Sequence, residues 1–183
     1  TEQAETTAML FMGVRMQCAQ CHHHPFEKWS QDDYYGLSAF FARLGTKTSQ
    51  EFGLFGRETV IFIRDTGDVR HPRKGVVVKP KALDGPEVDD PFDRRRKLGD
   101  WLTAGDNPYF ARNLANRFWA YLMGRGLVEP IDDMRSTNPP SNPDLLDALA
   151  AEMVKAKFDL RAFLKVILSS RAYQLSSTAT AEN

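Results

Sequence analysis

The sequence is short of cysteine, of net charge and of long apolar runs. Only two of its 183 residues are cysteines, so no network of disulfides holds the fold, and the chain is long enough to bury a core without one. Lysine plus arginine equal aspartate plus glutamate at 24 each, so no overall field draws the protein to nucleic acid or to an acidic membrane surface. The longest apolar run, AMLFMGV, is far too short to span a bilayer.

What the sequence does contain is the concentrated stretch CAQCHHH, residues 18–24. It holds both cysteines and three of the four histidines of the chain. Cys18, Cys21 and His22 have the C-x-x-C-H spacing of covalent c-type haem attachment, in which the thiols add to the two vinyl groups and the histidine binds the iron. The motif therefore predicts one covalent haem c.

Three other uses of a C-x-x-C pair compete with this interpretation. A zinc site would need Cys18, Cys21, His24 and the distant His71 as its four ligands. A thioredoxin-like dithiol should follow a strand and open a helix, whereas a helical pattern precedes this pair. A disulfide across two intervening residues closes almost no loop and would stabilise little.

The second axial ligand of the iron is a separate question, because His23 and His24 follow His22 too closely to reach the opposite face of a haem. His71 is the first candidate, since it is the one histidine outside the cluster and lies between two expected strands. Met134 is the best thioether candidate. The third possibility is that no protein ligand occupies this position.

Several neighbours are expected to support the haem. The second ring nitrogen of His22 needs an acceptor, and the nearest is a backbone carbonyl in the turn that follows it. His24 is expected to hydrogen-bond within that turn or to a haem propionate. Arg15, Lys28 and Arg73 are candidates to pair with the propionates.

The first part of the chain predicts helices followed by a small β insert. Apolar spacing predicts a helix over 3–17, and the capping-box spacing from Ser30 to Asp33 predicts a second helix to about Leu44. The β-branched runs at 59–65 and 75–80, separated by turns, predict a small antiparallel ribbon.

The rest of the chain predicts helices. Apolar residues at i, i+3 and i+4, with Asp or Asn-Pro at the starts, recur in four segments: 92–105, 107–126, 142–158 and 159–175. We therefore expect a mainly α protein: a haem-binding helical segment (1–45), a β-ribbon insert and linker (46–88), and a helical-bundle domain (89–183).

Long phrases of the sequence resemble two known families. FMGVRMQCAQCHHHPFEKWSQDDYYGLSAFFAR resembles the end of the planctomycete-specific cytochrome-like domain. GDVRHPRKGVVVKPKALDG, DNPYFARNLANRFWAYLMGRGLVEPIDDMRSTNPPSNPDLLDALA and FDLRAFLKVILSSRAYQLSS resemble the start of the domain of unknown function that follows it in the same polypeptides. The family phrase usually has CHDHPF or CHNHPF where this chain has CHHHPF, so little depends on His23.

The resemblance implies a piece of a longer polypeptide, exported from the cytoplasm to the periplasm or beyond, with haem c on Cys18, Cys21 and His22. Our leading hypothesis is a mono-haem cytochrome that transfers single electrons to a redox partner protein of unknown identity. The alternatives are a haem enzyme with an open distal site, acting on peroxide or another small ligand, and a binding or scaffold module with a structural haem. In the last case neighbouring regions would contact a polysaccharide.

Overall fold

The computed structural model describes residues 2–49, 58–176 and 178. Contacts divide the chain into two compact units, and the division is not at a single point in the sequence. The first unit consists of Thr1–Ala8 and Arg15–Leu102, and the second of Met9–Val14 and Thr103–Asn183. The three sequence domains proposed above remain a prediction, and residues 50–57 of the middle one lie outside the described residues.

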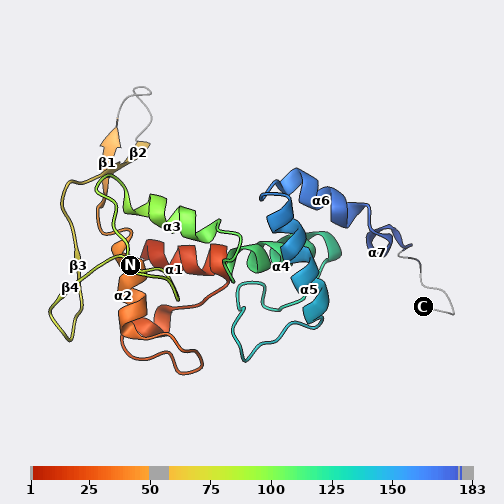
Figure 1. The fold of residues 1–183 in the computed structure, drawn as a ribbon, viewed down its shortest axis with the longest axis horizontal. Helices are drawn as coiled ribbons and strands as arrows, with labels where there is room; N and C mark the ends of the chain where they lie inside the picture. Colours follow the sequence, from red (N-terminus) through yellow and green to blue (C-terminus); the bar gives the residue numbers. More distant parts are fainter. Residues whose placement is uncertain (1, 50–57, 177, 179–183) are drawn as a thin grey trace. The chain divides into compact units, whose positions relative to one another are not determined.

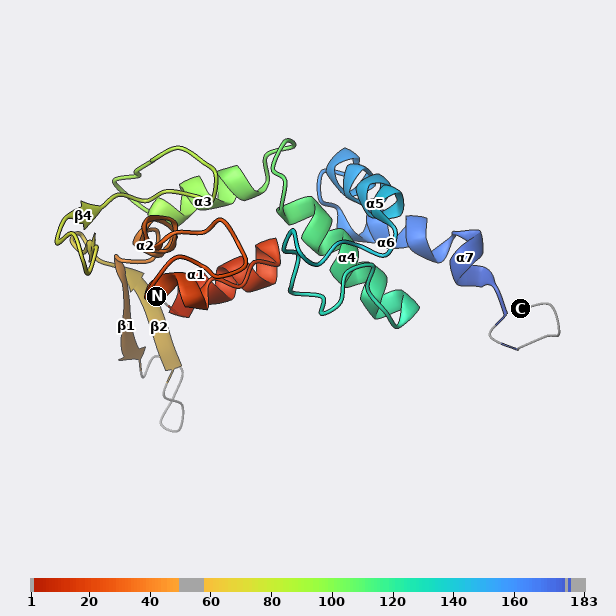
Figure 2. The ribbon, with the colours of Figure 1, turned by 90° about the horizontal axis from the view of Figure 1, so that it is seen from below.

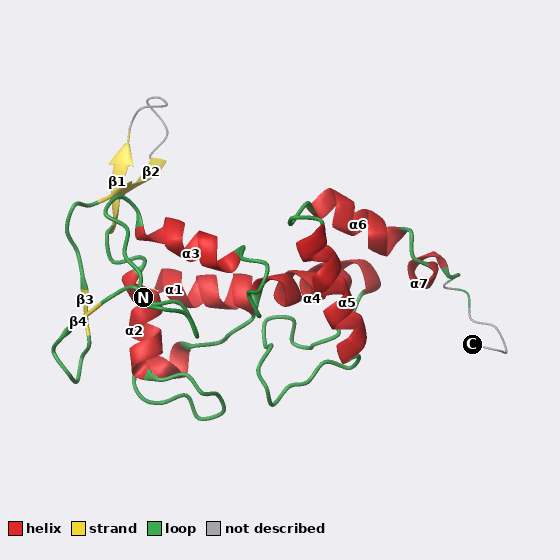
Figure 3. Cartoon of the chain, in the orientation of Figure 1, coloured by secondary structure: helices red, strands yellow, loops and turns green. Residues whose placement is uncertain are grey.

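Helices dominate both units, and every described strand belongs to the first unit (Figure 3). The expectation of a mainly α protein with a small antiparallel β insert is therefore confirmed. The helices of the first unit are α1 (Glu2–Thr7), the 3₁₀ turn η2 (Gln17–Gln20), α2 (Gln31–Ala39) and α3 (Arg94–Leu102). Those of the second unit are α4 (Phe110–Met123), α5 (Pro143–Lys155), α6 (Leu160–Leu168) and α7 (Arg171–Gln174).

The first helix is shorter than the sequence pattern predicts. The helix consists of α1 followed directly by the π-helical turn η1 (Ala8–Met12). It ends before Gly13, whose φ is +68°. A side chain at Gly13 would lie 2.3 Å from Cγ of Met134, so both the backbone angle and the available space require glycine there. The expected helix over 3–17 is therefore wrong beyond Met12.

Helix α2 begins where the sequence predicts. The side chain of Ser30 accepts a hydrogen bond from the backbone N–H of Asp33, and the Asp33 carboxylate accepts one from the backbone N–H of Ser30. The helix ends at Ala39, earlier than the expected Leu44, and a turn over 40–43 leads into the strand that begins at Leu44.

The strands form two separate hairpins instead of one ribbon. Strand β1 (Leu44–Ser49) pairs antiparallel with β2 (Glu58–Ile63), and β3 (Val69–Arg70) pairs antiparallel with β4 (Val77–Val78). Most of the run at 59–65 is thus a strand, but its partner is β1 and not the run at 75–80 with which it was expected to form a ribbon. Figure 1 shows the two hairpins as distinct features.

The second unit is built around one apolar core between α4, α5 and α6. Two of its helices start at the predicted caps: Asn142 accepts from the N–H of Leu145, and Asp159 accepts from the N–H groups of Arg161 and Ala162. Helix α4 begins at Phe110 without a side-chain cap, and the single helix expected over 159–175 is divided into α6 and α7. The largest side chains that are almost fully buried in this core are Leu146, Met153, Phe163 and Ile167.

The first unit also buries a charged side chain. Arg94 at the start of α3 is 5% exposed, and its guanidinium donates to Asp89 at 2.8 Å and to Asp68 at 2.9 Å. It also donates to the backbone carbonyls of Ala39 and Gly67. One arginine therefore joins three segments of the first unit.

Across the described ranges, no helix has the length and apolar character that crossing a lipid bilayer requires.

Candidate functional site

The C-x-x-C-H motif lies on a single tight turn of the first unit. Turn η2 contains Cys18, and the backbone N–H groups of Cys21 and His22 both donate to the Cys18 carbonyl at 3.4 Å. Residues three and four apart on a helical turn lie on the same side, and the side chains of all three residues are exposed. Ala19 is fully buried and anchors the turn to the unit. The turn therefore presents two thiols and an imidazole together.

Side chains from outside the motif hold this turn by its carbonyl groups. Gln20 O accepts from Nε2 of Gln31 at 2.8 Å and from the hydroxyl of Tyr35 at 3.2 Å. Cys21 O accepts from Nη2 of Arg73 at 3.0 Å. Gln31 and Tyr35 belong to α2, whereas Arg73 lies in the turn between β3 and β4. The backbone of the motif is thus fixed from two directions while its reactive groups stay free.

The ring of His22 is oriented by its own turn. Nδ1 lies 2.5 Å from the backbone oxygen of His23. A carbonyl oxygen only accepts hydrogen bonds, so Nδ1 carries the proton and Nε2 is the nitrogen with a free lone pair in the neutral ring. The expected backbone acceptor for His22 is therefore present, and it selects the tautomer that a metal ligand needs.

His24 closes the same turn. Its Nδ1 accepts from the backbone N–H of Phe26 at 3.2 Å, and its own N–H donates to the Trp29 carbonyl at 2.9 Å. The within-turn hydrogen bond expected for His24 is confirmed. Because Nδ1 accepts, Nε2 carries the proton in the neutral ring and can donate to another acceptor, such as a propionate.

His71 is near the motif but is not presented as a free ligand. It sits in the turn between β3 and β4 and is only 2% exposed. Its Nδ1 accepts from the backbone N–H groups of Arg73 at 3.2 Å and Lys74 at 3.3 Å. Nε2 therefore carries the proton. It lies 3.4 Å from Oδ1 of Asp32, in a geometry that makes no hydrogen bond.

Charges beside His71 stabilise the ionised form of Asp32. The Lys74 ammonium donates to both oxygens of Asp32, at 2.7 and 2.6 Å, and this hydrogen bonding lowers the pKa of Asp32 although partial burial opposes it. Burial and the nearby Cys21 raise the pKa of Tyr35, whose ring lies 5.5 Å from that of His71. His71, Tyr35 and Cys21 are thus parts of one neighbourhood.

The other predicted residues are distributed over both units. Arg73 contacts the motif directly, and Arg15 is exposed in the first unit. Lys28 pairs with Asp84 at 2.6 Å. Met134 belongs to the second unit, where its backbone N–H donates to the Gly13 carbonyl at 2.8 Å and its side chain packs against the apolar core.

A zinc site is not assembled from these residues. Among the residues that the structure describes, no three His, Cys, Asp or Glu side chains gather so that they could hold a metal ion. The four-ligand set considered for zinc has its cysteines exposed, while the His71 ring is turned into the interior. The arrangement instead offers one exposed imidazole and two thiols.

Sequence reasoning missed Gln31 and Tyr35. Both hold the motif through Gln20 O, and they lie one turn apart on α2. That spacing places them on one side of the helix. The spacing was available in the sequence, but nothing local indicated that this side would face residues 18–22.

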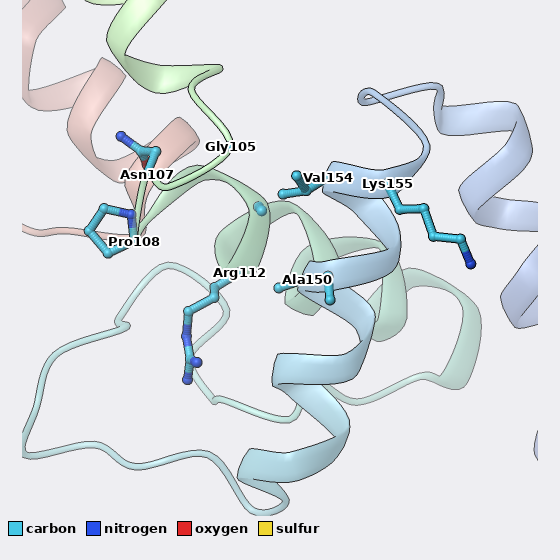
Figure 4. Close-up of a pocket in the computed structure, with 9 residues that line it drawn as sticks. Gly105, Asn107, Pro108, Arg112, Ala150, Val154 and Lys155 are labelled. Carbon is cyan, nitrogen blue, oxygen red and sulfur yellow. The ribbon is translucent and has the colours of Figure 1, made fainter.

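A separate pocket of about 410 Å³ lies in the second unit between a loop and helices α4 and α5. Figure 4 shows Ala150 and Val154 between the side chains of Arg112 and Lys155. Arg112 pairs with Asp147, and Lys155 donates to Glu152 at 2.9 Å, so both cations already have carboxylate partners. The residues predicted to bind the haem are not among those that line this pocket.

Comparison with known proteins gives two family matches. Residues 1–46 match the family described as "PSCyt2: Protein of unknown function (DUF1549)", and residues 94–183 match "PSD1: Protein of unknown function (DUF1553)". No curated protein and no solved structure matches the chain. The chain is therefore similar to two planctomycete-type domains of unknown function, joined in tandem.

Proposed function

We propose that the first unit binds one haem c covalently through Cys18 and Cys21, with Nε2 of His22 as an axial ligand. The observation that carries this proposal is the hydrogen bond from Nδ1 of His22 to the His23 carbonyl. It leaves the lone pair on the exposed side of an imidazole, next to two exposed thiols on the same turn.

The residues of the turn fit such a group in three respects. The thiols are free and accessible, so each can add to a vinyl group to form a thioether. The backbone is held by Gln31, Tyr35 and Arg73, none of which occupies the thiols or the His22 ring nitrogen that binds. The Nε2–H of His24 is a donor suited to a propionate.

A bound haem would supply one-electron chemistry at its iron. The part of the protein in that chemistry is to fix the orientation of His22 and to set the polarity around it. Arg73, which contacts Cys21 O, adds positive charge beside the motif, and this favours the anionic propionates. We propose that the protein, with its haem, functions as an exported mono-haem cytochrome that exchanges electrons with a partner protein.

The test is to express the chain in a periplasm equipped with a c-type cytochrome maturation system. We expect denaturing mass spectrometry to show the chain heavier by one haem and acid-acetone extraction to leave the pigment on the protein. A colourless chain under conditions that mature a control cytochrome contradicts the proposal.

Variants separate attachment from ligation. Cys18→Ala together with Cys21→Ala should abolish covalent attachment. His22→Ala should keep the thioethers but displace the Soret band, whereas His23→Ala should leave the spectrum as in the wild type because only the backbone of His23 is used. An unchanged spectrum in His22→Ala would show that another residue is the axial ligand.

The state of His71 favours a second candidate function, a haem protein that binds a small exogenous ligand such as peroxide. For His71 to bind iron, it must either release two backbone N–H groups from Nδ1 or remove the proton from Nε2. If His71 does not ligate, and Met134 does not either, the distal position stays open to such a ligand.

Spectra decide between the two candidates. A low-spin spectrum that becomes high spin in His71→Ala supports ligation by His71, and the same result in Met134→Ala supports the thioether. A wild type that is already high spin and binds carbon monoxide or cyanide rapidly favours the small-ligand function.

A further inference from the structure

The hairpin β1–β2 has two chemically different faces. Its register places Leu44 opposite Ile63, Thr46 opposite Ile61 and Thr48 opposite Thr59. Since side chains alternate along a strand, these six residues share one face, which carries no charge. Ile61 is 61% exposed and Ile63 is 41% exposed on it. The charged residues Lys47 and Glu58, and Arg64 just after β2, lie on the opposite face.

The outer edge of β2 is open. The N–H of Arg64 donates to the carbonyl of Arg43 at 2.8 Å, which continues the ladder to β1 by one residue. In an antiparallel pair only every second residue is hydrogen-bonded to the partner, so the N–H and C=O groups of Thr59, Ile61 and Ile63 face away from β1. Among the described strands, β2 pairs with β1 alone. Figures 1 and 2 both show this hairpin extending away from helix α2 of the same unit.

We propose that this edge pairs with β2 of a second copy of the chain, antiparallel and with Ile61 on the two-fold axis. Outward-facing residues must pair with outward-facing residues, so Ile61 faces Ile61 and Thr59 faces Ile63 of the second copy. In this register Glu58 lies opposite Arg64 of the second copy, and the symmetry produces that ion pair twice.

Neighbouring registers lack this complementarity. A pairing centred on Val60 puts Glu58 opposite Phe62, and one centred on Phe62 puts Arg64 opposite Val60. Only the Ile61-centred pairing matches opposite charges at both ends of the new ladder while it joins the two uncharged faces into one. Charge complementarity thus selects a second copy of this chain as the partner.

Pairing with a second copy would stabilise the hairpin. An isolated two-stranded hairpin is marginally stable in water, and an open β-branched edge is a site of strand addition. The new sheet would have four strands. The contact involves only a few residues of each copy, so the dimer should be weak and dependent on concentration. It requires no haem and does not depend on the function proposed above.

The first experiment removes one edge donor from the full chain. Ile61→Pro deletes an N–H that the hairpin does not use internally, so sedimentation velocity should show a monomer where the wild type shows dimers at high concentration. Thr46→Pro is the matched control, because it deletes an N–H from the outer edge of β1 and should leave the dimer intact. A wild type that is monomeric up to high concentration, or an Ile61→Pro variant that dimerises as well as the wild type, overturns the proposal.

The second experiment tests the register. Glu58→Arg or Arg64→Glu alone should weaken dimerisation about tenfold, because each creates two like-charge contacts, and the double variant should restore it. Arg96→Glu makes the same charge change on α3 and should have no effect. A double variant as weak as the single ones contradicts the pairing of Glu58 with Arg64.

Discussion

Each of the two units of this protein buries apolar side chains, such as Tyr34, Phe40 and Leu83 in the first unit, but the first unit also relies on polar contacts between distant residues. The second unit packs α4, α5 and α6 around a continuous apolar core, and its helices carry caps and periodicity that are visible in the sequence. The first unit has shorter helices and two small hairpins, and much of its organisation comes from side chains that hydrogen-bond to distant backbone or to carboxylates, such as Arg94 and Arg73. Apolar packing preserves a unit without defining a site, whereas the polar contacts of the first unit position a specific turn.

The same difference appears in the charges. Four carboxyl groups of the first unit have a lowered pKa: Asp32, Asp89, Asp90 and Asp93. Hydrogen bonds from Lys74 and from Arg95 cause the lowering for Asp32 and Asp93, and backbone N–H groups cause it for Asp90. For Asp89, burial alone would raise the pKa, but the bonds from Arg94 and from a backbone N–H outweigh it. The first unit should therefore be the more sensitive to acid.

Removing a side chain from the core of the second unit should cause the largest loss of stability. Phe163 on α6 is fully buried, so Phe163→Ala should lower the free energy of unfolding by about 3–5 kcal/mol. Leu160→Ala on the same helix is the control, since Leu160 is 41% exposed, and should cost far less. Urea titration followed by circular dichroism measures both. Equal losses in the two variants would mean that α6 does not contribute to the core as described.

Gly13→Ala should cause the second-largest loss of stability, because it combines an unfavourable backbone angle with a steric overlap. The added methyl would lie 2.3 Å from Met134 Cγ and 2.9 Å from Asn113 Oδ1, and we expect a loss of about 2–4 kcal/mol. Gly99→Ala within α3 meets nothing within 4 Å and should be neutral or stabilise by about 0.5–1 kcal/mol. Thermal unfolding of the two variants compares them directly.

Arg94→Met should weaken the first unit by about 1–3 kcal/mol, since it removes the charged hydrogen bonds while it keeps much of the apolar stem. The lowered pKa of Asp89 contributes stability above about pH 4, and this contribution is lost as the pH falls through the folded-state pKa. The variant should therefore lose less stability on acidification than the wild type.

Tryptophan fluorescence can show that this difference in acid sensitivity arises in the first unit. Trp29 and Trp101 belong to the first unit and Trp119 to the second. In a Trp119→Phe background, acid should shift the urea midpoint of the wild type more than that of Arg94→Met. The same shift in both would show that Arg94 does not account for the acid sensitivity.

Loss of a helix cap should cause the smallest loss of stability, and the same kind of substitution can be made in both units. Ser30→Ala at α2 and Asn142→Ala at α5 each remove one side-chain cap and should cost about 1 kcal/mol. Only Ser30→Ala should also loosen the turn at residues 18–22, because α2 carries Gln31 and Tyr35. Amide hydrogen exchange at residues 18–22 measures this difference, and equal protection in both variants would contradict the role assigned to α2.

The sequence by itself determined the features whose signals are local. The caps at Ser30, Asn142 and Asp159 and the helices of the second unit follow from spacing within a few residues, and so does the placement of Cys18, Cys21 and His22 on one turn. The backbone acceptor for His22 was also within reach, because it belongs to the next residue.

Only the tertiary structure decided the rest, because those features depend on residues far apart in the chain. The residue that follows the first helix, Gly13, must be glycine because Met134 occupies the space beside it, and β1 forms because β2 pairs with it. His71 was the first candidate for a distal ligand, and the structure adds that its ring is buried, that two backbone N–H groups bind its Nδ1, and that α2 contacts the strands on either side of its turn. Local propensity cannot specify such contacts, since their free energy arises only when the distant partners meet.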